Sequence, residues 1–286
     1  MLFAQIITNG LLLGGLYGLM ALGMALVWGV LNIVNLAHGA FIMLGGYTAY
    51  YLFTYVGTDP FAALPAVMAV LFVVGYGLQR YLLNFIVRSP PMNTLLITFG
   101  IQVVITYVAQ LAFSADFRGI NPGYAAASIT VLGITVPAVR LAAWTVALVL
   151  AAALWLLLRR TRLGRAIRAM SQDLVAARLY GIAPRRLYSV TFGIGAALAG
   201  AAGTLYGVIS QISPYVGADL TVKSFVIVII GGLGNPLGIV AGGLLIGVAE
   251  SLAALYLGPT FTDVISFGLL VVMLVVRPGR LLKGAA

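Results

Sequence analysis

The chain has 286 residues, of which 62% are hydrophobic and only 8% are charged, and its mean hydropathy is +1.12. These few polar residues cannot cover the surface of a water-soluble globular protein. The composition therefore predicts an integral membrane protein. The net charge of +10 does not indicate nucleic-acid binding, because the basic residues gather at the ends of apolar segments, as in membrane proteins. The absence of cysteine excludes disulfides and cysteine nucleophiles.

The first apolar segment, residues 6–28, is long enough to span a bilayer, and no charged residue precedes it. A cleaved signal peptide begins with a basic region, so we expect this segment to remain part of the fold. Gly10, Gly14 and Gly18 recur at four-residue spacing, which favours close backbone contact with a neighbouring helix.

A second membrane helix is predicted to end near residue 55, and polar residues interrupt the apolar run before it. Asn35 is expected to satisfy the backbone of a broken helix, and His38 to cap a helix or bond to a carbonyl. A place on the translocation pathway is the functional alternative for both residues.

Three more helices are predicted at residues 61–83, 95–113 and 141–158. The loop between the last two, residues 114–140, is expected outside the membrane. It contains β-branched residues on either side of Gly133, which predicts a short hairpin on the membrane surface.

The next segment, residues 159–186, is expected on the cytoplasmic side because it holds eight of the sixteen basic residues. Apolar residues recur within it at helical spacing, which predicts one amphipathic helix from Arg165 to Tyr180. Gly181 can cap this helix, and Pro184 prevents it from resuming. The stripe consists of Leu163, Ile167, Met170 and Leu174.

The remainder must begin outside and end inside, because Arg277, Arg280 and Lys283 follow the last apolar segment. A helix at 187–209, with small residues at positions 195, 199, 203 and 207, runs outward, and the last helix, 261–276, runs inward.

Between these helices we expect a discontinuous, re-entrant element. A half-helix at 223–230 enters the membrane, the run GGLGNPLG breaks it, and a helix at 239–256 returns. Glu250 is expected to face water or to pair with Lys223. The break supplies further candidates for the translocation pathway, namely Gly231, Gly232, Gly234 and Asn235.

The predicted fold is therefore an all-α integral membrane protein, a single transmembrane domain over residues 1–286. It has about eight membrane segments, an outside N-terminus, a cytoplasmic C-terminus and a short cytoplasmic helix. The chain lacks a Gly-Lys-Ser/Thr phosphate loop and a second histidine for a metal site, so an enzyme is not predicted.

The run from Val175 to Gly181 resembles the coupling motif of ABC importer permeases, Glu-Ala-Ala-x-x-x-Gly, with Val175 in place of Glu. Together with NLAHGAFIMLGGY and GGLGNPLG, it resembles the branched-chain amino acid permeases of the LivH type over residues 6–280.

The resemblance implies a subunit of the bacterial inner membrane that pairs with a second permease, either a paralogue or a second copy. Its other partners would be two cytoplasmic ATPase subunits and a periplasmic substrate-binding protein. The chain itself would bind no cofactor, and its partners would use ATP. The implied ATPase-coupling residues are Arg165, Ile167, Arg168, Met170, Leu174, Ala176, Ala177 and Gly181.

Several alternatives stay open at the level of sequence. Related permeases serve amides or urea, an ion-coupled secondary transporter would need coupling carboxylates near the bilayer centre, and a membrane scaffold would use the basic segment to bind a partner. The amphipathic helix could also rest on anionic membrane lipid.

Overall fold

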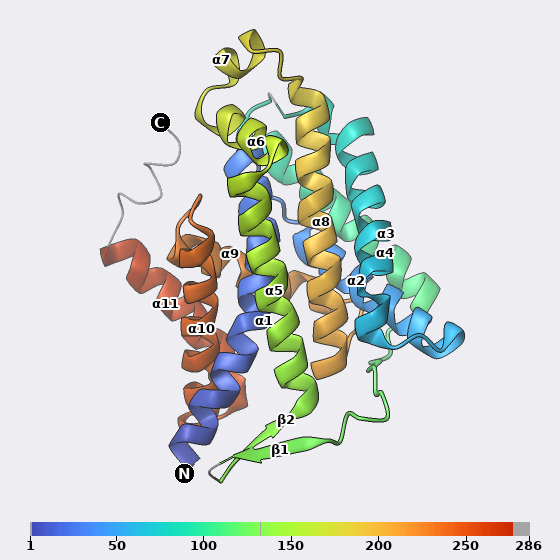
Figure 1. The fold of residues 1–286 in the computed structure, drawn as a ribbon, viewed down its shortest axis with the longest axis vertical. Coiled ribbons are helices and arrows are strands. Elements are labelled where there is room, and N and C mark those ends of the chain that lie inside the picture. The colour runs from blue at the N-terminus through green and yellow to red at the C-terminus, as the bar shows by residue number, and fades with distance from the viewer. Residues whose placement is uncertain (1, 88, 132, 277–286) are drawn as a thin grey trace.

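The computed structural model describes residues 2–87, 89–131 and 133–276, which form a bundle of helices with one β-hairpin (Figure 1). Six helices in this part of the chain are long and apolar enough to cross a membrane. They are α1 (Leu2–Leu31), α3 (Pro60–Tyr81, extended by a 3₁₀ turn over Leu83–Phe85), α4 (Pro91–Phe113), α5 (Ala138–Arg160), α8 (Pro184–Ile209) and α10 (Pro236–Tyr256). The prediction of a helical, multi-pass membrane protein is therefore confirmed.

Shorter helices complete the bundle. At 1.5 Å per residue, the 16 residues of α9 extend about 24 Å, less than the roughly 30 Å hydrocarbon core of a bilayer. The shorter elements are α2 (His38–Tyr51, continued by a π-helical turn over Leu52–Val56), α6 (Arg162–Gln172), α7 (Leu174–Leu179), α9 (Val216–Gly231), a 3₁₀ turn (Pro259–Phe261) and α11 (Thr262–Val276).

The hairpin predicted around Gly133 is confirmed, with β1 (Ser128–Val131) antiparallel to β2 (Ile134–Pro137). It lies at the same end of the bundle as the start of α1, and α6 and α7 lie at the opposite end (Figure 1). The Gln5 side chain donates to the Thr135 carbonyl at 2.7 Å and accepts from the Thr135 N–H at 2.8 Å. The hairpin is thereby attached to the first turns of α1.

Helix α1 lies in the centre of the bundle and packs against α5, α8, α9 and α10. Its contact with α10 is made by backbone, as the first glycine spacing predicts. A Cβ atom at Gly14 would lie 2.6 Å from the Leu244 Cα, and one at Gly247 would lie 2.5 Å from the Gly14 Cα. No side chain larger than hydrogen fits at either position.

The second stripe of small residues, on α8, is also confirmed as a packing surface. A Cβ atom at Gly203 would lie 1.8 Å from the Ile42 carbonyl oxygen on α2, and one at Gly195 would lie 3.0 Å from the Gly23 oxygen on α1. Because α8 contacts α1, α2 and α3, it forms a second buried layer beside α1.

The outer helices α3, α4 and α5 expose large apolar side chains over much of their length. Val73 on α3, Leu111 on α4 and Val149 on α5 are examples, with Leu111 89% exposed. Exposed apolar surface on this scale is expected where lipid is the solvent.

We predict that Gly14→Ala lowers the free energy of unfolding by about 1–3 kcal/mol, because the added methyl group overlaps α10 backbone. Unfolding by SDS titration in mixed micelles measures the change. Gly77→Ala on α3 is the matched control, since its Cβ would meet nothing within 4 Å. Equal stability of the two variants would contradict the close α1–α10 contact.

Candidate functional site

The arginine-rich segment forms two helices, α6 and α7, so the prediction of one continuous helix from Arg165 to Tyr180 is wrong. Asp173 interrupts it with extended backbone, at φ −150° and ψ 109°. Its carboxylate accepts hydrogen bonds from the N–H groups of Val175 and Ala176, at 2.7 and 3.0 Å. A side chain that caps the following turn in this way starts a new helix rather than continuing the old one.

The apolar stripe of α6 faces the chain's own bundle. Ile167 is 2% exposed and Met170 is 4% exposed, and Leu163 and Leu174 pack against the same core. In this structure the stripe is therefore covered by the bundle and is not a free surface. Its apolar surface instead attaches α6 to α1, α5 and α8.

Exposed apolar side chains are found on α7, which projects beyond the rest of the bundle (Figure 1). Val175 is 67% exposed, Leu179 84% and Tyr180 88%. Sequence reasoning named Val175 only as the first position of the coupling motif, and missed Leu179 and Tyr180 because they lie off the spacing of the predicted stripe. The signal was nevertheless present, since Leu179 and Tyr180 form an apolar pair directly after Arg178 in a polar segment.

The predicted coupling residues thus separate into two sets. Those that the bundle covers or partly covers hold the segment in place, and those that remain exposed can meet a partner. The first set is Ile167, Met170, Leu174, Ala176 and Ala177, and the second is Arg165, Arg168 and Gly181.

Gly181 ends α7 as the sequence predicts. Its φ of +79° lies in the left-handed region, its N–H donates to the Arg178 carbonyl, and the Ile182 N–H donates to the Ala177 carbonyl. This is the hydrogen-bond pattern of a Schellman motif. Pro184 then begins α8 at a position where a missing N–H costs nothing.

Asn35 and His38 lie inside the bundle, 2% and 1% exposed. Asn35 Oδ1 accepts a hydrogen bond from the Ala37 N–H at 3.1 Å, and His38 Nε2 lies 2.9 Å from the Met20 carbonyl oxygen. Both side chains therefore satisfy backbone groups, as predicted. The contact with Met20 also places the start of α2 beside the interior of α1, about eleven residues before α1 ends.

Two threonines that sequence reasoning missed hold the non-helical residues 32–37 in place. Thr221 on α9 accepts from the Gly39 N–H at 2.8 Å, and its hydroxyl lies 3.1 Å from the Leu36 carbonyl oxygen. Thr98 on α4 accepts from the Leu36 N–H at 3.3 Å. In the sequence each threonine is one β-branched residue within an apolar helix. No neighbouring residue indicates that it binds backbone groups of a distant segment.

The run GGLGNPLG separates α9 from α10, as expected. Gly232 and Gly234 have φ values of +84° and +83°, which L side chains rarely adopt. Asn235 Oδ1 accepts from the Gly238 N–H at 3.2 Å and caps α10. Gly231, at the end of α9, packs directly on the first turn of α10. All four candidates therefore build the turn itself.

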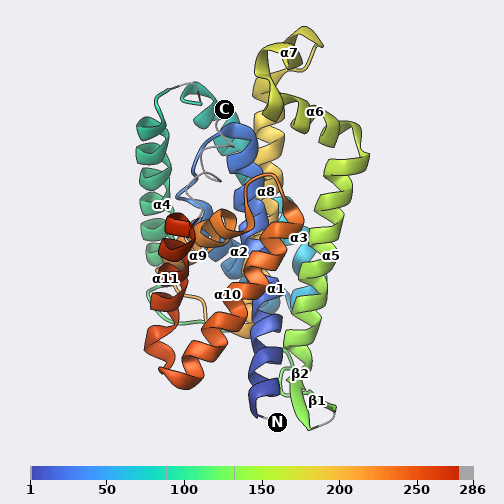
Figure 2. The same ribbon diagram turned by 90° about the vertical axis from the view of Figure 1, so that its left-hand side faces the viewer.

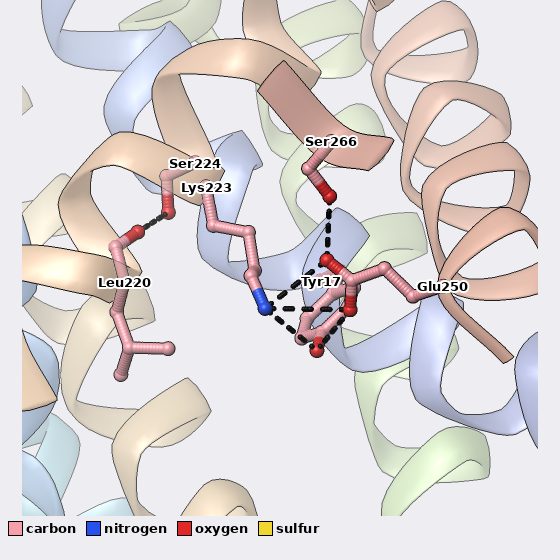
Figure 3. Close-up of polar contacts among 6 residues, drawn as sticks. All are labelled: Tyr17, Leu220, Lys223, Ser224, Glu250 and Ser266. Carbon is pink, nitrogen blue, oxygen red and sulfur yellow. Dashed lines mark hydrogen bonds and ion pairs between the residues drawn. The ribbon is translucent and has the colours of Figure 1, made fainter. Parts of the chain in front are cut away.

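A charge pair with two hydroxyl groups joins the four helices α1, α9, α10 and α11 (Figure 3). Glu250 on α10 is 4% exposed, and its carboxylate lies 3.1 Å from Lys223 Nζ on α9, as the predicted pairing requires. The hydroxyl groups of Tyr17 on α1 and Ser266 on α11 donate to the same carboxylate at 2.8 and 2.6 Å. Both carboxylate oxygens are thus satisfied, which is the condition under which a buried charge pair is tolerable.

The described residues contain no group of three or more His, Cys, Asp or Glu side chains that could hold a metal ion. The structure offers two features for a function: the exposed apolar tip of α7, and the broken helices α2 and α9, whose backbones meet inside the bundle.

Residues 6–274 match the family model described as "Branched-chain amino acid transport system / permease component". The chain belongs to this family. It is therefore a permease component of an ABC transport system for branched-chain amino acids, a class without an ATPase site of its own. The family decides against the ion-coupled carrier and scaffold alternatives.

Similarity to individual relatives covers almost the whole permease. It is 32% identical to the high-affinity branched-chain amino acid transport system permease protein LivH of Salmonella typhimurium, over 98% of this chain and 95% of that one. Identity to the high-affinity branched-chain amino acid transport system permease protein BraD of Pseudomonas aeruginosa is 30%, over 98% of this chain and 95% of BraD. Identity to the Escherichia coli permease LivM is also 30%, over 93% of this chain and 68% of LivM. No solved structure matches.

We predict that Glu250→Gln in the permease lowers the free energy of unfolding by roughly 3 kcal/mol, because the partly buried Lys223 ammonium loses its counter-charge. The double variant Lys223→Met/Glu250→Gln should recover much of the loss, since no unpaired charge remains. SDS unfolding of Glu250→Gln, Lys223→Met and the double variant gives the coupling energy between the two side chains. Additive losses would show that the pair does not act as a unit.

Proposed function

We propose that this chain is one of two permease subunits of an ATP-driven importer in the bacterial inner membrane, paired with a LivM-like paralogue. Similarity to both LivH and LivM supports this pairing, because the two Escherichia coli permeases are both relatives of this chain. Two cytoplasmic ATPase subunits and a periplasmic substrate-binding protein complete the assembly, and this chain binds no cofactor itself.

The observation that carries the proposal is the exposed tip of α7. Three large apolar side chains stand on a short helix with arginines beside it, at the end of the bundle where positive charge is concentrated. An apolar anchor surrounded by charge has the composition of a protein-binding hot spot. The tip would insert into a groove of the ATPase, and Arg165, Arg168 and Arg178 would orient it against an acidic rim.

Movement of this tip would reach the membrane helices through two connections. Asp173 joins α7 to α6, which is packed on the bundle, and Gly181 and Pro184 join α7 directly to α8. Closure of the ATPase pair would therefore act on α6 and α8, and the permease pair would switch between outward and inward access.

The topology that fits this function has residues 114–140 and the N-terminus outside and residues 159–186 inside. The positions of the hairpin and α7 at opposite ends of the bundle support it. Residues 1–286 would form a single permease domain. The C-terminal Arg277, Arg280 and Lys283, also expected inside, lie outside the described residues.

The re-entrant element is retained in this proposal, with α9 and α10 as its two arms. The short length of α9 and the glycine turn after it support this assignment. The start of α2 meets α9 inside the bundle, where Gly39 contacts Gly217 and Thr221. The translocation pathway would pass beside this crossing, with Asn35, His38 and residues 231–235 holding its shape rather than contacting substrate.

We predict that Leu179→Glu lowers ATP-dependent leucine uptake in proteoliposomes at least about tenfold. Loss of an apolar anchor typically costs about 2 kcal/mol or more of binding free energy, which corresponds to roughly 30-fold in affinity. Ile129→Glu places the same change on the exposed hairpin at the other end and should leave ATPase binding intact. Normal uptake by Leu179→Glu, or uptake without ATP, would contradict the proposal.

We predict that single cysteines report opposite sides of the membrane. Because the chain contains no cysteine, each label is unique. Ala126→Cys should react with a membrane-impermeant maleimide in intact spheroplasts, whereas Val175→Cys, at an exposed position, should react only after permeabilisation. The reverse pattern would overturn the proposed topology.

A further inference from the structure

A cavity of about 610 Å³ opens between α1, α5, α6 and the start of α10, near the arginine-rich end of the bundle. Figure 2 shows α10, α1 and α5 next to one another, with α6 above α5. No described residue of α7 lines the cavity. Arg168 is the one lining residue that the coupling proposal also uses, and coupling to an ATPase explains neither the size of the cavity nor its apolar wall.

The lining of this cavity is divided by polarity. Its inner wall is apolar, with Leu22 and Leu26 on α1, Leu154 on α5 and Ile239 on α10. Its rim carries arginine, hydroxyl and amide side chains from three different segments. The polar rim residues are Arg159, Arg168, Ser171, Gln172 and Asn235.

The charge of the rim is entirely positive. No Asp or Glu lines the cavity, and neither arginine has a carboxylate partner in the described part of the chain. The Arg159 guanidinium lies 5.1 Å from the centre of the Trp155 ring, and Arg168 donates to the Leu158 carbonyl. Both guanidinium groups are thus held in position by neutral groups and keep their charge available for an anion.

An occupant must therefore combine an anionic head with an apolar body. In a membrane protein this combination describes an anionic phospholipid, and basic pockets between helices at the positively charged side are suited to such headgroups. We propose that the cavity binds one anionic phospholipid, with its phosphate between Arg159 and Arg168 and its acyl chains along α1, α5 and α10.

The volume agrees with this occupant. A cavity of about 610 Å³ that is not fully enclosed would hold a headgroup and the first part of the acyl chains, which would then continue beyond it. Because the lining joins α6 to Asn235 at the start of α10, a bound lipid would hold α6 against the glycine turn. The proposal extends beyond the transport function, since it concerns how the membrane itself stabilises the coupling segment.

Trp155 lines the cavity and provides a reporter. The full-length permease, with any subunits that co-purify, is placed in nanodiscs that contain brominated phosphatidylglycerol or brominated phosphatidylcholine at matched fractions. The measured signal is the difference in fluorescence quenching between the permease and its Trp155→Phe variant. This subtraction removes the contribution of the other tryptophans. We expect phosphatidylglycerol to quench at a lower mole fraction, by about 5-fold for each arginine that contacts the headgroup.

Variants separate the headgroup contact from the apolar wall. Arg159→Gln/Arg168→Gln should remove the preference for phosphatidylglycerol, whereas Arg162→Gln, on α6 but outside the lining, should retain it. Gly29→Leu adds bulk inside the cavity where its Cβ meets nothing within 4 Å, and should reduce quenching by both lipids. Gly100→Leu, equally open on α4, is its control.

Three results would overturn the proposal. Equal quenching by the two lipids would show that no anionic headgroup is selected. Protection of Trp155 by millimolar inorganic phosphate would show a site for a soluble anion instead of a lipid. Absence of quenching in the assembled transporter, together with quenching of the isolated chain, would show that a partner subunit covers the cavity.

Discussion

Backbone groups that leave a helix inside an apolar bundle must find partners there, and the structure depends on how they do so. Residues 32–37 leave the end of α1 and return into the bundle before α2 begins. Asn35 satisfies part of this segment from within, and Thr98 and Thr221 satisfy it from α4 and α9. His38 connects the start of α2 to the Met20 carbonyl group of α1. Without these contacts the chain could not begin a helix at this depth.

The features that sequence predicts well are those with a local cause. Glycine at four-residue spacing indicates close backbone contact whatever the partner is, and α1 and α8 both confirm this. Gly181 and the glycines of the α9–α10 turn have positive φ values that only particular residues tolerate easily. The pairing of Lys223 with Glu250 follows from the high free-energy cost of burying a charge that has no partner.

The features that sequence reasoning missed have causes distant in the chain. Periodicity finds the apolar stripe of α6 but not which surface covers it, so Ile167 and Met170 were assigned to a partner instead of to the bundle. The break at Asp173 is an exception, because its cause is local: the Asp173 carboxylate caps the next helix. The sequence marks Leu179 and Tyr180 as an apolar pair, but their exposure depends on α7 extending past the bundle.

The crossing of α2 and α9 limits how this permease can change shape. A Cβ atom at Gly39 would lie only 1.8 Å from the Gly217 carbonyl oxygen, so the two backbones touch with no layer of side chains between them. Side chains that change rotamer can absorb small rotations of packed helices, but bare backbone has nothing to rearrange. The crossing must therefore move as one rigid body, and bending between α9 and α10 is left to the peptide units around Gly232 and Gly234.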